Sequence, residues 1–557
     1  MGKAGRNRTS IRTWLRQPLC WLAVAMAAAV LLSACSFFAR PAGNTTFYVS
    51  PSGNDSAAGT SPDTAWRTLA RASSADLKPG DRLLLRGGSR FAGQLRFGPH
   101  DAGDPGQPVQ VGSYGSGRAT IAATGGTAIV VFDTAGIDLR DLVIVGKQPA
   151  RASSVGIQLF SDRPAGHRLK HIVIAQVDVS GFGDGISIGA EHPAAGFAGV
   201  QITNSALHDN LTAGLSAYGP RFDAAAPAYA HADLRVSHVT VFRNRGDPAT
   251  TTSNTGNGIV LGSVSGASVR WSTAYRNGGS NGAPHEGPIG IWAYDSTKVV
   301  IEHSLSYRNQ TASRRDGGGF GLDQNTSESS LQYNLSYDNA GAGYQVYAPN
   351  NAHSYGNVVR FNISSGDATQ TINAAGIIVA GPVSRATVYH NTVVMGPSAG
   401  DWSHPALWLG AVHQVTVRNN IFMMAHPGPV VIALTAIPRS AALLQGNDYF
   451  TTARQWSVLW GISRPYDSLS SWRGATGQES TRGKASGLTV NPRLAGPVTN
   501  LSASTVTGRA NSAGFRLLPG SPVRQAGLNL RAFGIDPGPV DYFGAPLRAG
   551  RPDIGAG

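Results

Sequence analysis

A nine-residue phrase that recurs through the middle of the chain constrains the fold more than any other feature of the sequence. Four clear copies end at Asn244, Asn277, Asn309 and Asn339, and weaker copies end at Asn210, Asp367, Gly396 and Ala425. Successive copies are 34, 33, 32, 30, 28, 29 and 29 residues apart, which is too short for a propeller blade. A near-constant period of this length is typical of a solenoid, in which each coil lies against the next.

The residues of each copy favour β-strands. β-branched and apolar residues surround a polar centre, and a Gly opens a second short alternating run some residues later. One coil of short strands cannot bury its own apolar side, so it packs against the next coil. The 70 glycines and the 14% of charged residues suit a body rich in turns. We therefore predict an all-β fold of the parallel β-helix type.

The fourth position of the phrase carries a column of small polar residues. Asn334, Asn362, Asn391 and Asn420 recur every 28 or 29 residues, and Ser272 and Ser304 precede them. An amide stacked on its copy at a bend satisfies backbone groups of the turn. This column resembles the asparagine ladder of the pectin-lyase-like superfamily. The resemblance implies a single-stranded right-handed parallel β-helix with a short N-terminal cap helix and a C-terminal closing segment.

The first residues predict export. Five basic residues and no acid precede an uncharged stretch from Leu19 to Leu32, and the sequence up to Cys35 resembles a bacterial lipobox. Fourteen uncharged residues fall short of the roughly 20 that a spanning helix needs, which weakens the alternative of a transmembrane anchor. We expect residues 1–34 to be a signal peptide and Cys35 to be lipidated. Ser36 implies, by resemblance to known lipoproteins, an outer-membrane location, periplasmic or surface-facing.

Cysteine content and charge narrow the function. Cys20 and Cys35 are the only cysteines, so the mature chain has neither a disulfide nor a catalytic thiol. Removing residues 1–34 lowers the net charge from +14 to +9, because five basic residues and no acid are lost. A basic exported surface suits an anionic polysaccharide or lipid head groups, although a merely solubilising charge explains it equally well. No nucleic-acid recognition motif is present, so we do not expect nucleic acid as a partner. We expect the protein to be a monomer.

The chain divides into segments by composition and resemblance. We expect a linker at 35–45, an N-terminal cap and first rungs at 46–125, β-helix repeats at 126–450 and a closing segment at 451–557. A short helix with an Asp467 or Ser468 cap is predicted near residues 467–479. Capping is needed because an open solenoid end exposes strand edges and core.

The runs that follow the rung glycines place side chains on the outside of the coil. Strand alternation sends the second and fourth residues after each Gly to solvent, which gives Trp292 and Tyr294, then Gly321 and Asp323, then Gln345 and Tyr347. Since coils are about 4.8 Å apart, we expect Asp323 to lie between the two tyrosines and near Trp292. A carboxylate between aromatic rings suits a sugar chain.

Polar loops precede these runs and supply further acids. Glu286 and Asp316 occupy nearly equivalent places on neighbouring coils, so we predict that Asp323, Asp316 and Glu286 are catalytic, as in acid and base hydrolysis of a glycosidic bond. The predicted substrate-binding residues are Trp292, Tyr294, Gln345, Tyr347, His285, Arg314 and Arg315. The run from Asp316 to Asp323 also resembles the Asp-Gly-x-Gly-Phe runs of β-helix polysaccharide lyases.

Alternatives stay open at this point. Resemblance to the lyases implies an Arg or Lys base and often Ca²⁺ held by several acids. Here Arg314, Arg315, Lys298 and His285 are the nearest bases and no dense acidic cluster is present, so Ca²⁺ is expected only if the reaction is elimination. The histidines show no spacing for a metal site. Hydrolase, lyase and epimerase chemistry remain possible, as does a non-catalytic lipoprotein that binds polysaccharide, in which Asp316 and Asp323 only cap turns.

Overall fold

The structure, a computed structural model, describes residues 44–147, 150–396, 404–462, 465–496 and 510–557. The predicted signal peptide and the predicted lipid site at Cys35 lie outside the described residues. Within the described ranges, no helix has both the length and the apolar character needed to cross a bilayer.

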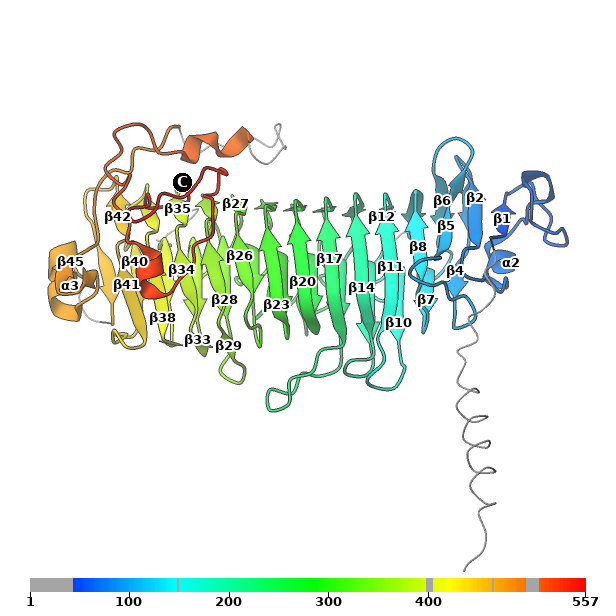
Figure 1. The fold of residues 1–557 in the computed structure, drawn as a ribbon, viewed down its shortest axis with the longest axis horizontal. Coiled ribbons are helices and arrows are strands. Elements are labelled where there is room, and N and C mark those ends of the chain that lie inside the picture. Colours follow the sequence, from blue (N-terminus) through cyan, green and yellow to red (C-terminus); the bar gives the residue numbers. More distant parts are fainter. Residues whose placement is uncertain (1–43, 148–149, 397–403, 463–464, 497–509) are drawn as a thin grey trace, which may run out of the picture. The chain divides into compact units, whose positions relative to one another are not determined.

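Each coil of the chain contributes one strand to each of three parallel sheets, here called A, B and C (Figure 1). Sheet A contains, in order of pairing, β1 (Thr46–Val49), β2 (Arg82–Arg86), β5 (Val109–Tyr114), β8 (Ile137–Arg140), β11 (Leu169–Ala175), β14 (Phe197–Thr203), β17 (His231–Ser237), β20 (Val264–Arg270), β23 (Thr297–Glu302), β26 (Ser330–Gln332), β30 (Val358–Arg360), β34 (Thr387–Tyr389), β38 (Val415–Arg418) and β41 (Ala442–Gln445).

Sheet B contains β3 (Arg90–Ala92), β6 (Ala119–Ala122), β9 (Leu142–Val145), β12 (Asp178–Ser180), β15 (Ala206–His208), β18 (Thr240–Phe242), β21 (Thr273–Tyr275), β24 (Leu305–Tyr307), β27 (Leu335–Tyr337), β31 (Ile363–Ser365), β35 (Thr392–Met395), β39 (Ile421–Met424) and β42 (Asp448–Thr451). Sheet C contains β4 (Leu95–Phe97), β7 (Thr127–Phe132), β10 (Val155–Ser161), β13 (Asp184–Ala190), β16 (Ala213–Tyr218), β19 (Asn257–Gly262), β22 (Ile289–Tyr294), β25 (Gly318–Leu322), β28 (Tyr344–Tyr347), β32 (Ile377–Ala380), β36 (Leu407–Leu409), β40 (Val431–Ala433) and β43 (Val458–Trp460). Smaller pairings join β29 (Ser354–Tyr355), β33 (Val383–Ser384) and β37 (Val412–His413), and β44 (Ser480–Thr481) with β45 (Lys484–Ala485).

The register confirms that the recurring phrases lie over one another. Val236 pairs with Val269, and Val269 with Ile301, which lie at the same place in three successive copies. Inward residues of sheet C stack in the same way, as Ile291 pairs with Phe320 and Phe320 with Tyr344, and all three are fully buried. The core is therefore a continuous column that grows with each coil, as the period predicts.

The asparagine ladder predicted at the fourth position is present at the turn between sheets A and B. The side-chain Nδ2 of Asn334 donates to Oδ1 of Asn362 at 3.1 Å, and Asn362 donates to Asn391 at 3.0 Å. The series continues through Asn420 to Asn447, whose Nδ2 donates to Oε1 of Glu479 at 2.7 Å. A carboxyl group thus ends the ladder.

A second ladder, which the sequence analysis did not identify, lies at the turn between sheets B and C. It runs through the last residues of the phrases, Asn210, Asn244, Asn277, Asn309 and Asn339, and each Nδ2 donates to Oδ1 of the next residue at 2.8–3.0 Å. Asp367 is the final acceptor. Both turns of the coil that flank sheet B are therefore fixed by buried amides, because turn backbone groups need partners once the next coil covers them.

Aromatic rings also stack from coil to coil. Phe242, Tyr275, Tyr307 and Tyr337 have ring centroids 4.7–5.1 Å apart and form a continuous column on sheet B. A second stack, at the turn between sheets A and B, runs from His238 through Trp271, His303, Tyr333 and Phe361 to His390. The faces of these rings are occupied by their neighbours, so they stabilise the coil rather than present binding platforms.

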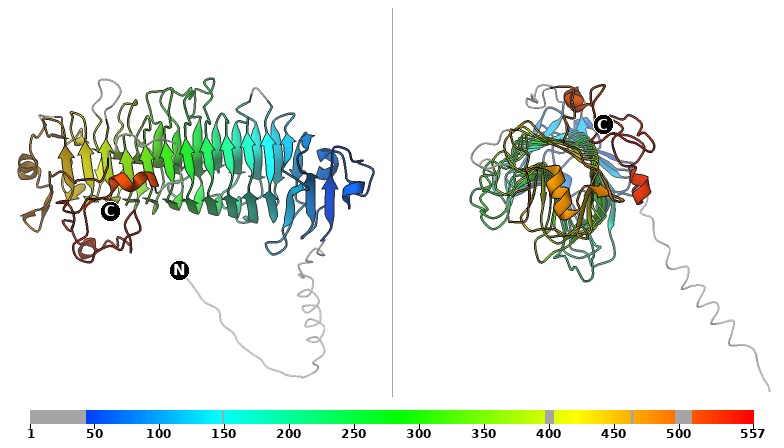
Figure 2. Two further views of the ribbon diagram at one scale, coloured as in Figure 1. Left: turned by 90° about the horizontal axis from the view of Figure 1, so that it is seen from above. Right: turned by 90° about the vertical axis from the view of Figure 1, so that its left-hand side faces the viewer.

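Both ends of the stack are covered. At the N-terminal end, β1, the short helix η1 (Pro62–Thr64) and α2 (Leu69–Ser73) pack around the buried Trp66. At the other end, α3 (Leu469–Thr476) begins after Ser468, whose side chain accepts from the backbone N–H of Ser471, and this confirms the predicted capped helix. The closing segment, with η2 (Ala510–Phe515) and η3 (Leu530–Phe533), returns along the coils, as Figure 2 shows.

Candidate functional site

The outer face of sheet C carries two columns of outward side chains. In the first column, the residues that pair from strand to strand are Ser187, Ser216, Val260, Trp292, Gly321, Gln345, Ile378 and Trp408. The second column lies two residues further along each strand and includes Tyr218, Tyr294, Asp323 and Tyr347. Strand alternation therefore brings these predicted site residues onto one surface, although Trp292 and Gln345 are largely covered.

The floor of this face dips at β25. Its outward residue is Gly321, which has no side chain and lies between Trp292 and Gln345 of the neighbouring coils. A Cβ at Gly321 would lie 3.2 Å from Cδ1 of Ile289 and 3.3 Å from both Cγ of Gln345 and Cβ of Trp292. Side chains of three neighbouring residues therefore already close around Gly321. This position, here called the depression because it has no side chain between Trp292 and Gln345, is preceded by Asp316 and followed by Asp323 along the chain.

Asp316 lies on the loop from sheet B to sheet C. Its φ of 50° and that of Gly317, 75°, turn the chain just before β25. Oδ2 accepts a hydrogen bond from the backbone N–H of Gly287 at 2.8 Å, so the residue bridges two neighbouring coils. Burial raises the pKa of Asp316 to about 6, although this hydrogen bond and the charge of Arg315 favour the ionised form.

Asp323 follows β25 at the other end. Its Oδ1 accepts from the backbone N–H of Gln324 at 2.8 Å, and burial, followed by the negative charge of Asp316, raises its pKa to about 7. Tyr347 responds to both acids, since its pKa is raised by burial and then by the charges of Asp323 and Asp316. The charge of Asp316 therefore acts on Asp323, and both acids act on one phenol; the two residues are here called the carboxyl pair.

The carboxyl pair has the protonation that acid and base chemistry needs. Burial raises the pKa of Asp316 to about 6 and that of Asp323 to about 7, so near neutral pH Asp316 is mostly ionised while Asp323 holds a proton in a large fraction of the molecules. Cleavage of a glycosidic bond uses one acid of each kind.

A cavity of ≈380 Å³ adjoins the pair on the side of the later coils. Five predicted residues line it, namely His285, Arg315, Asp316, Gln345 and Tyr347, together with Ala342, Thr371, Ile372, Asn373, Ala374, Ile378, Ala380 and Trp408. The sequence analysis missed Trp408 because its strand is preceded by Ala406 rather than by a rung glycine. Trp408 pairs with Ile378, so it has the second, outward position of its strand. The alternation of that strand could therefore have identified Trp408 from the sequence.

Tyr294 does not flank Asp323 in the way that the sequence predicted. It adjoins Asp323 in the column, but its ring extends over Gly262 of the preceding coil, where a Cβ would lie 2.3 Å from Cζ of Tyr294. The charges that raise the pKa of Tyr294, after burial, are those of Asp295, Tyr218 and Asp184. The ring turns away from the carboxyl pair because the glycine leaves it room, so Asp323 has Tyr347 as its neighbouring phenol.

Three other predicted residues lie at the margin. Glu286 is exposed, and its charge contributes to the raised pKa values of Asp316 and Asp323. Arg314 is also exposed, and its backbone carbonyl accepts from the N–H of Ile372, which ties two loops of the cavity wall together. Trp292 donates its Nε1–H to Oδ1 of Asn257 at 3.0 Å, so its indole is fixed beside the depression.

Metal ligation has no support in the described part of the chain. Among those residues, no group of three or more His, Cys, Asp or Glu side chains is placed to hold a metal ion.

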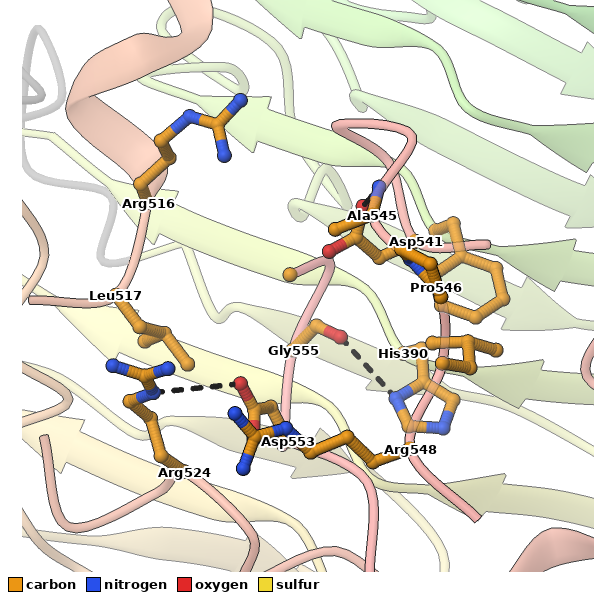
Figure 3. Close-up of a pocket in the computed structure, with 13 residues that line it drawn as sticks. His390, Arg516, Leu517, Arg524, Asp541, Ala545, Pro546, Arg548, Asp553 and Gly555 are labelled. Atoms are coloured by element: carbon orange, nitrogen blue, oxygen red, sulfur yellow. Dashed lines mark hydrogen bonds and ion pairs between the residues drawn. The ribbon is translucent and has the colours of Figure 1, made fainter. Parts of the chain in front are cut away.

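A second cavity, of ≈270 Å³, lies between the coils and the closing segment (Figure 3). Its wall includes Arg516, Arg524 and Arg548, but Arg524 pairs with Asp553 at 3.8 Å and Asp541 lies on the same wall. His390 lies at 3.3 Å from the carbonyl oxygen of Gly555. The contact of His390 with Gly555 joins the closing segment to the coils, whereas Arg524 and Asp553 both belong to that segment, and no predicted site residue lies there.

Comparison with known proteins identifies the family. The model described as "Right handed beta helix region" matches residues 119–422, which is more than half of the chain. This chain belongs to the right-handed β-helix family. The predicted right-handed parallel β-helix is thereby confirmed.

Relatives of this β-helix include carbohydrate-active proteins. Lacto-N-biosidase of Bifidobacterium longum subsp. longum is 23% identical over 476 residues, which cover 68% of this chain but only 29% of that protein. The native GH136 lacto-N-biosidase from Eubacterium ramulus has a TM-score of 0.38 at 12% identity, with 84% of this chain and 70% of that chain covered. Pectate lyase Pel9A has a TM-score of 0.39 at 16% identity, with 92% of this chain and 96% of that chain covered.

Proposed function

We propose that this β-helix protein hydrolyses glycosidic bonds and that the carboxyl pair performs the reaction. The observation that carries the proposal is the pair itself, two interacting acids with pKa values of about 6 and about 7 beside a floor position without a side chain. The protonated member donates to the leaving oxygen, and the ionised member acts as nucleophile or activates water. The similarity to a lacto-N-biosidase supports this reaction class, although this chain spans 29% of that relative's length.

Neighbouring residues have defined roles in this proposal. A sugar at the depression lies over Gly321, against Trp292 on one side and Gln345 on the other. Tyr347 is 40% exposed and supplies both a ring face and a hydroxyl near the pair. His285 and Arg315 in the adjoining cavity suit a polar or anionic neighbouring sugar. Glu286, at the margin, contributes through its charge.

The test uses soluble protein that lacks residues 1–35. It is incubated with neutral and uronate polysaccharides and with an aryl lacto-N-bioside, and both reducing ends and ultraviolet absorbance are followed. Hydrolysis produces reducing ends without an unsaturated product, and Asp316→Asn and Asp323→Asn each lower the rate at least a hundredfold. The control is Asp233→Asn, which removes an exposed acid paired with Arg235 at 2.9 Å and leaves the rate unchanged.

Other outcomes redirect the proposal. An ultraviolet-absorbing product indicates elimination, with Arg315 or His285 as the base and Ca²⁺ dependence to be tested with chelator. Binding that survives both asparagine variants without any cleavage indicates a non-catalytic polysaccharide-binding protein. If cleavage occurs and both variants retain it, the assignment of the carboxyl pair is wrong.

Export and lipid attachment form a second part of the proposal. The uncharged stretch that ends at Cys35 supports a lipid-anchored protein at a bacterial membrane, where a polysaccharide substrate is accessible. Metabolic labelling with palmitate tests this, since Cys35→Ser abolishes the label if Cys35 is the lipidated residue. We also propose that the protein is a monomer. Sedimentation of the soluble form would test this.

A further inference from the structure

Glycine and tyrosine alternate on the outer face of sheet C, in the column that also contains Asp323. Gly189 pairs with Tyr218 and Gly262 pairs with Tyr294, while the pairing of Ala217 with Leu261 places Tyr218 beside Gly262. The column therefore reads Gly189, Tyr218, Gly262, Tyr294 and then Asp323. We call the two tyrosines the tyrosine strip.

Both rings of the tyrosine strip lie over the glycine of the preceding coil. A Cβ at Gly189 would lie 2.4 Å from Cζ of Tyr218, and a Cβ at Gly262 would lie 2.3 Å from Cζ of Tyr294. Neither glycine has a positive φ, so the backbone would accept other residues there. The rings are the reason for glycine, because any side chain would displace them.

A ring that lies on glycine backbone has one face covered by that backbone, and the ring of Tyr294 also packs against that of Trp292, with centroids 5.4 Å apart and an interplanar angle of 34°. Tyr218 and Tyr294 are both partly exposed. The sheet B column is different, because its rings stack on one another with centroids 4.7–5.1 Å apart and so cover each other's faces. The strip thus offers flat aromatic surfaces of the kind on which the apolar face of a sugar ring packs.

Polar groups accompany the strip. Asp184 is partly exposed, and its Oδ2 accepts a hydrogen bond from Oγ of Ser216 at 3.0 Å. Its charge contributes, after burial, to the raised pKa values of Tyr218 and Tyr294, which places the acid near both phenols. Ser216 and the two phenols provide partners for sugar hydroxyl groups next to the stacking surfaces, while Asp184, whose Oδ1 is buried, holds the Ser216 hydroxyl through Oδ2.

We propose that the tyrosine strip, with Asp184 and Ser216, is a second carbohydrate-binding site that holds the distal part of a long glycan chain. The proposal rests on the proposed function, since it places that glycan across the carboxyl pair. The strands that the two rings cover, β19 and β13, lie two and four coils from β25, which is about 10 Å and about 19 Å along the stack. A disaccharide at the depression cannot reach Tyr218, so the substrate is an oligosaccharide or polysaccharide that runs along the coil axis.

Binding to an array of neutral and uronate oligosaccharides, from disaccharides to octasaccharides, tests the inference without requiring turnover. The soluble protein carrying Asp316→Asn is compared with the same protein that also carries Tyr218→Ala or Tyr294→Ala. Each added change is expected to weaken binding of the longest oligosaccharide about tenfold, with little effect on the disaccharide. Tyr355→Ala is the matched control, because Tyr355 is 39% exposed on β29, outside sheet C.

Gly262→Ala is the second variant, because it keeps both tyrosines but removes the space for the ring of Tyr294. It should weaken binding of the longest oligosaccharide to the same extent as Tyr294→Ala, with an unchanged circular dichroism spectrum. The inference is overturned if the strip variants and the Tyr355 control bind equally well, or if no oligosaccharide binds at all. If length-dependent binding needs the strip while the parent protein with an intact pair cleaves nothing, the strip remains a binding site and hydrolysis is rejected.

Discussion

Replacing Asp367 by Asn should make the protein less sensitive to pH, because Asp367 ends the second ladder as a buried acid. Its Oδ1 accepts from the backbone N–H and Nδ2 of Asn339 at 3.0 and 2.8 Å, and its Oδ2 accepts from Oγ of Ser364 at 2.7 Å. Burial, which outweighs these hydrogen bonds, raises the pKa of Asp367 from its ordinary value of 3.8 to about 7. An Asn at this position continues the ladder with the same acceptor oxygen and never ionises.

The size of the expected change in the free energy of unfolding follows from the difference in the pKa of Asp367 between the folded and unfolded states. Between pH 4 and pH 7 the folded state keeps a proton that the unfolded chain releases, so the stabilisation from Asp367 is full below pH 4 and is lost as the pH rises through 7. The gap between 3.8 and about 7 corresponds to about 4 kcal/mol. Asp367→Asn should therefore unfold at a higher urea concentration than the parent at pH 7.5, while the two proteins differ little at pH 4.

Urea denaturation followed by tryptophan fluorescence at several pH values checks this expectation. Asp184 and Asp448, whose pKa values burial also raises to about 7, contribute a pH dependence of the same sign to both proteins, so the difference between variant and parent isolates Asp367. The reasoning would be refuted if Asp367→Asn raised the free energy of unfolding equally at pH 4 and pH 7.5, or if it lowered the free energy of unfolding at pH 7.5. The first result would indicate better packing, and the second an essential carboxylate.

Three further predictions concern the site and the ladder. The rate of glycan cleavage should peak between pH 6 and pH 7 and fall on both sides, because one member of the Asp316 and Asp323 pair must be ionised and the other protonated; a rate that rises steadily to pH 9 would contradict this. Gly321→Val should lower kcat/KM at least tenfold and should also lower the melting temperature, because a Cβ there would lie 3.2–3.3 Å from atoms of Ile289, Gln345 and Trp292; an unchanged kcat/KM would contradict a sugar position over Gly321. Asn391→Ala should lower the free energy of unfolding by roughly 2–5 kcal/mol, measured by urea denaturation, because it leaves the buried backbone N–H of Asn362 without an acceptor and removes one of the two acceptors of its Nδ2; a change under about 1 kcal/mol would argue against the ladder.

Much of the site was predictable because strand alternation is a local property. Once the rung glycines align the runs, the second and fourth residues face outward, and this places Gln345, Tyr347 and Asp323 on one face. Asp316 was found through its position before β25. Trp408 was not predicted, because the outward positions were counted from the rung glycines and Ala406 occupies the place of the rung glycine before β36.

The direction of each ring was not predictable in the same way. Tyr294 and Tyr347 have equivalent positions on their strands, yet Tyr294 extends over Gly262 while the phenol of Tyr347 responds to the carboxyl pair. A rotamer depends on the free space beside the side chain, and that space belongs to a residue about thirty positions away in the sequence. Only the stacking of the coils brings Tyr294 and Gly262 together.

The sequence by itself determined the coil. A period of 28–34 residues, alternating apolar residues and an amide at each bend allow few other folds, because each coil must bury its inner face against the next. The tertiary structure decided which polar groups interact and with what charge. The raised pKa values of Asp316 and Asp323 arise first from burial by neighbouring coils, then from the charge of Glu286 on Asp316 and of Asp316 on Asp323, and burial by neighbouring coils does not exist until those coils are stacked.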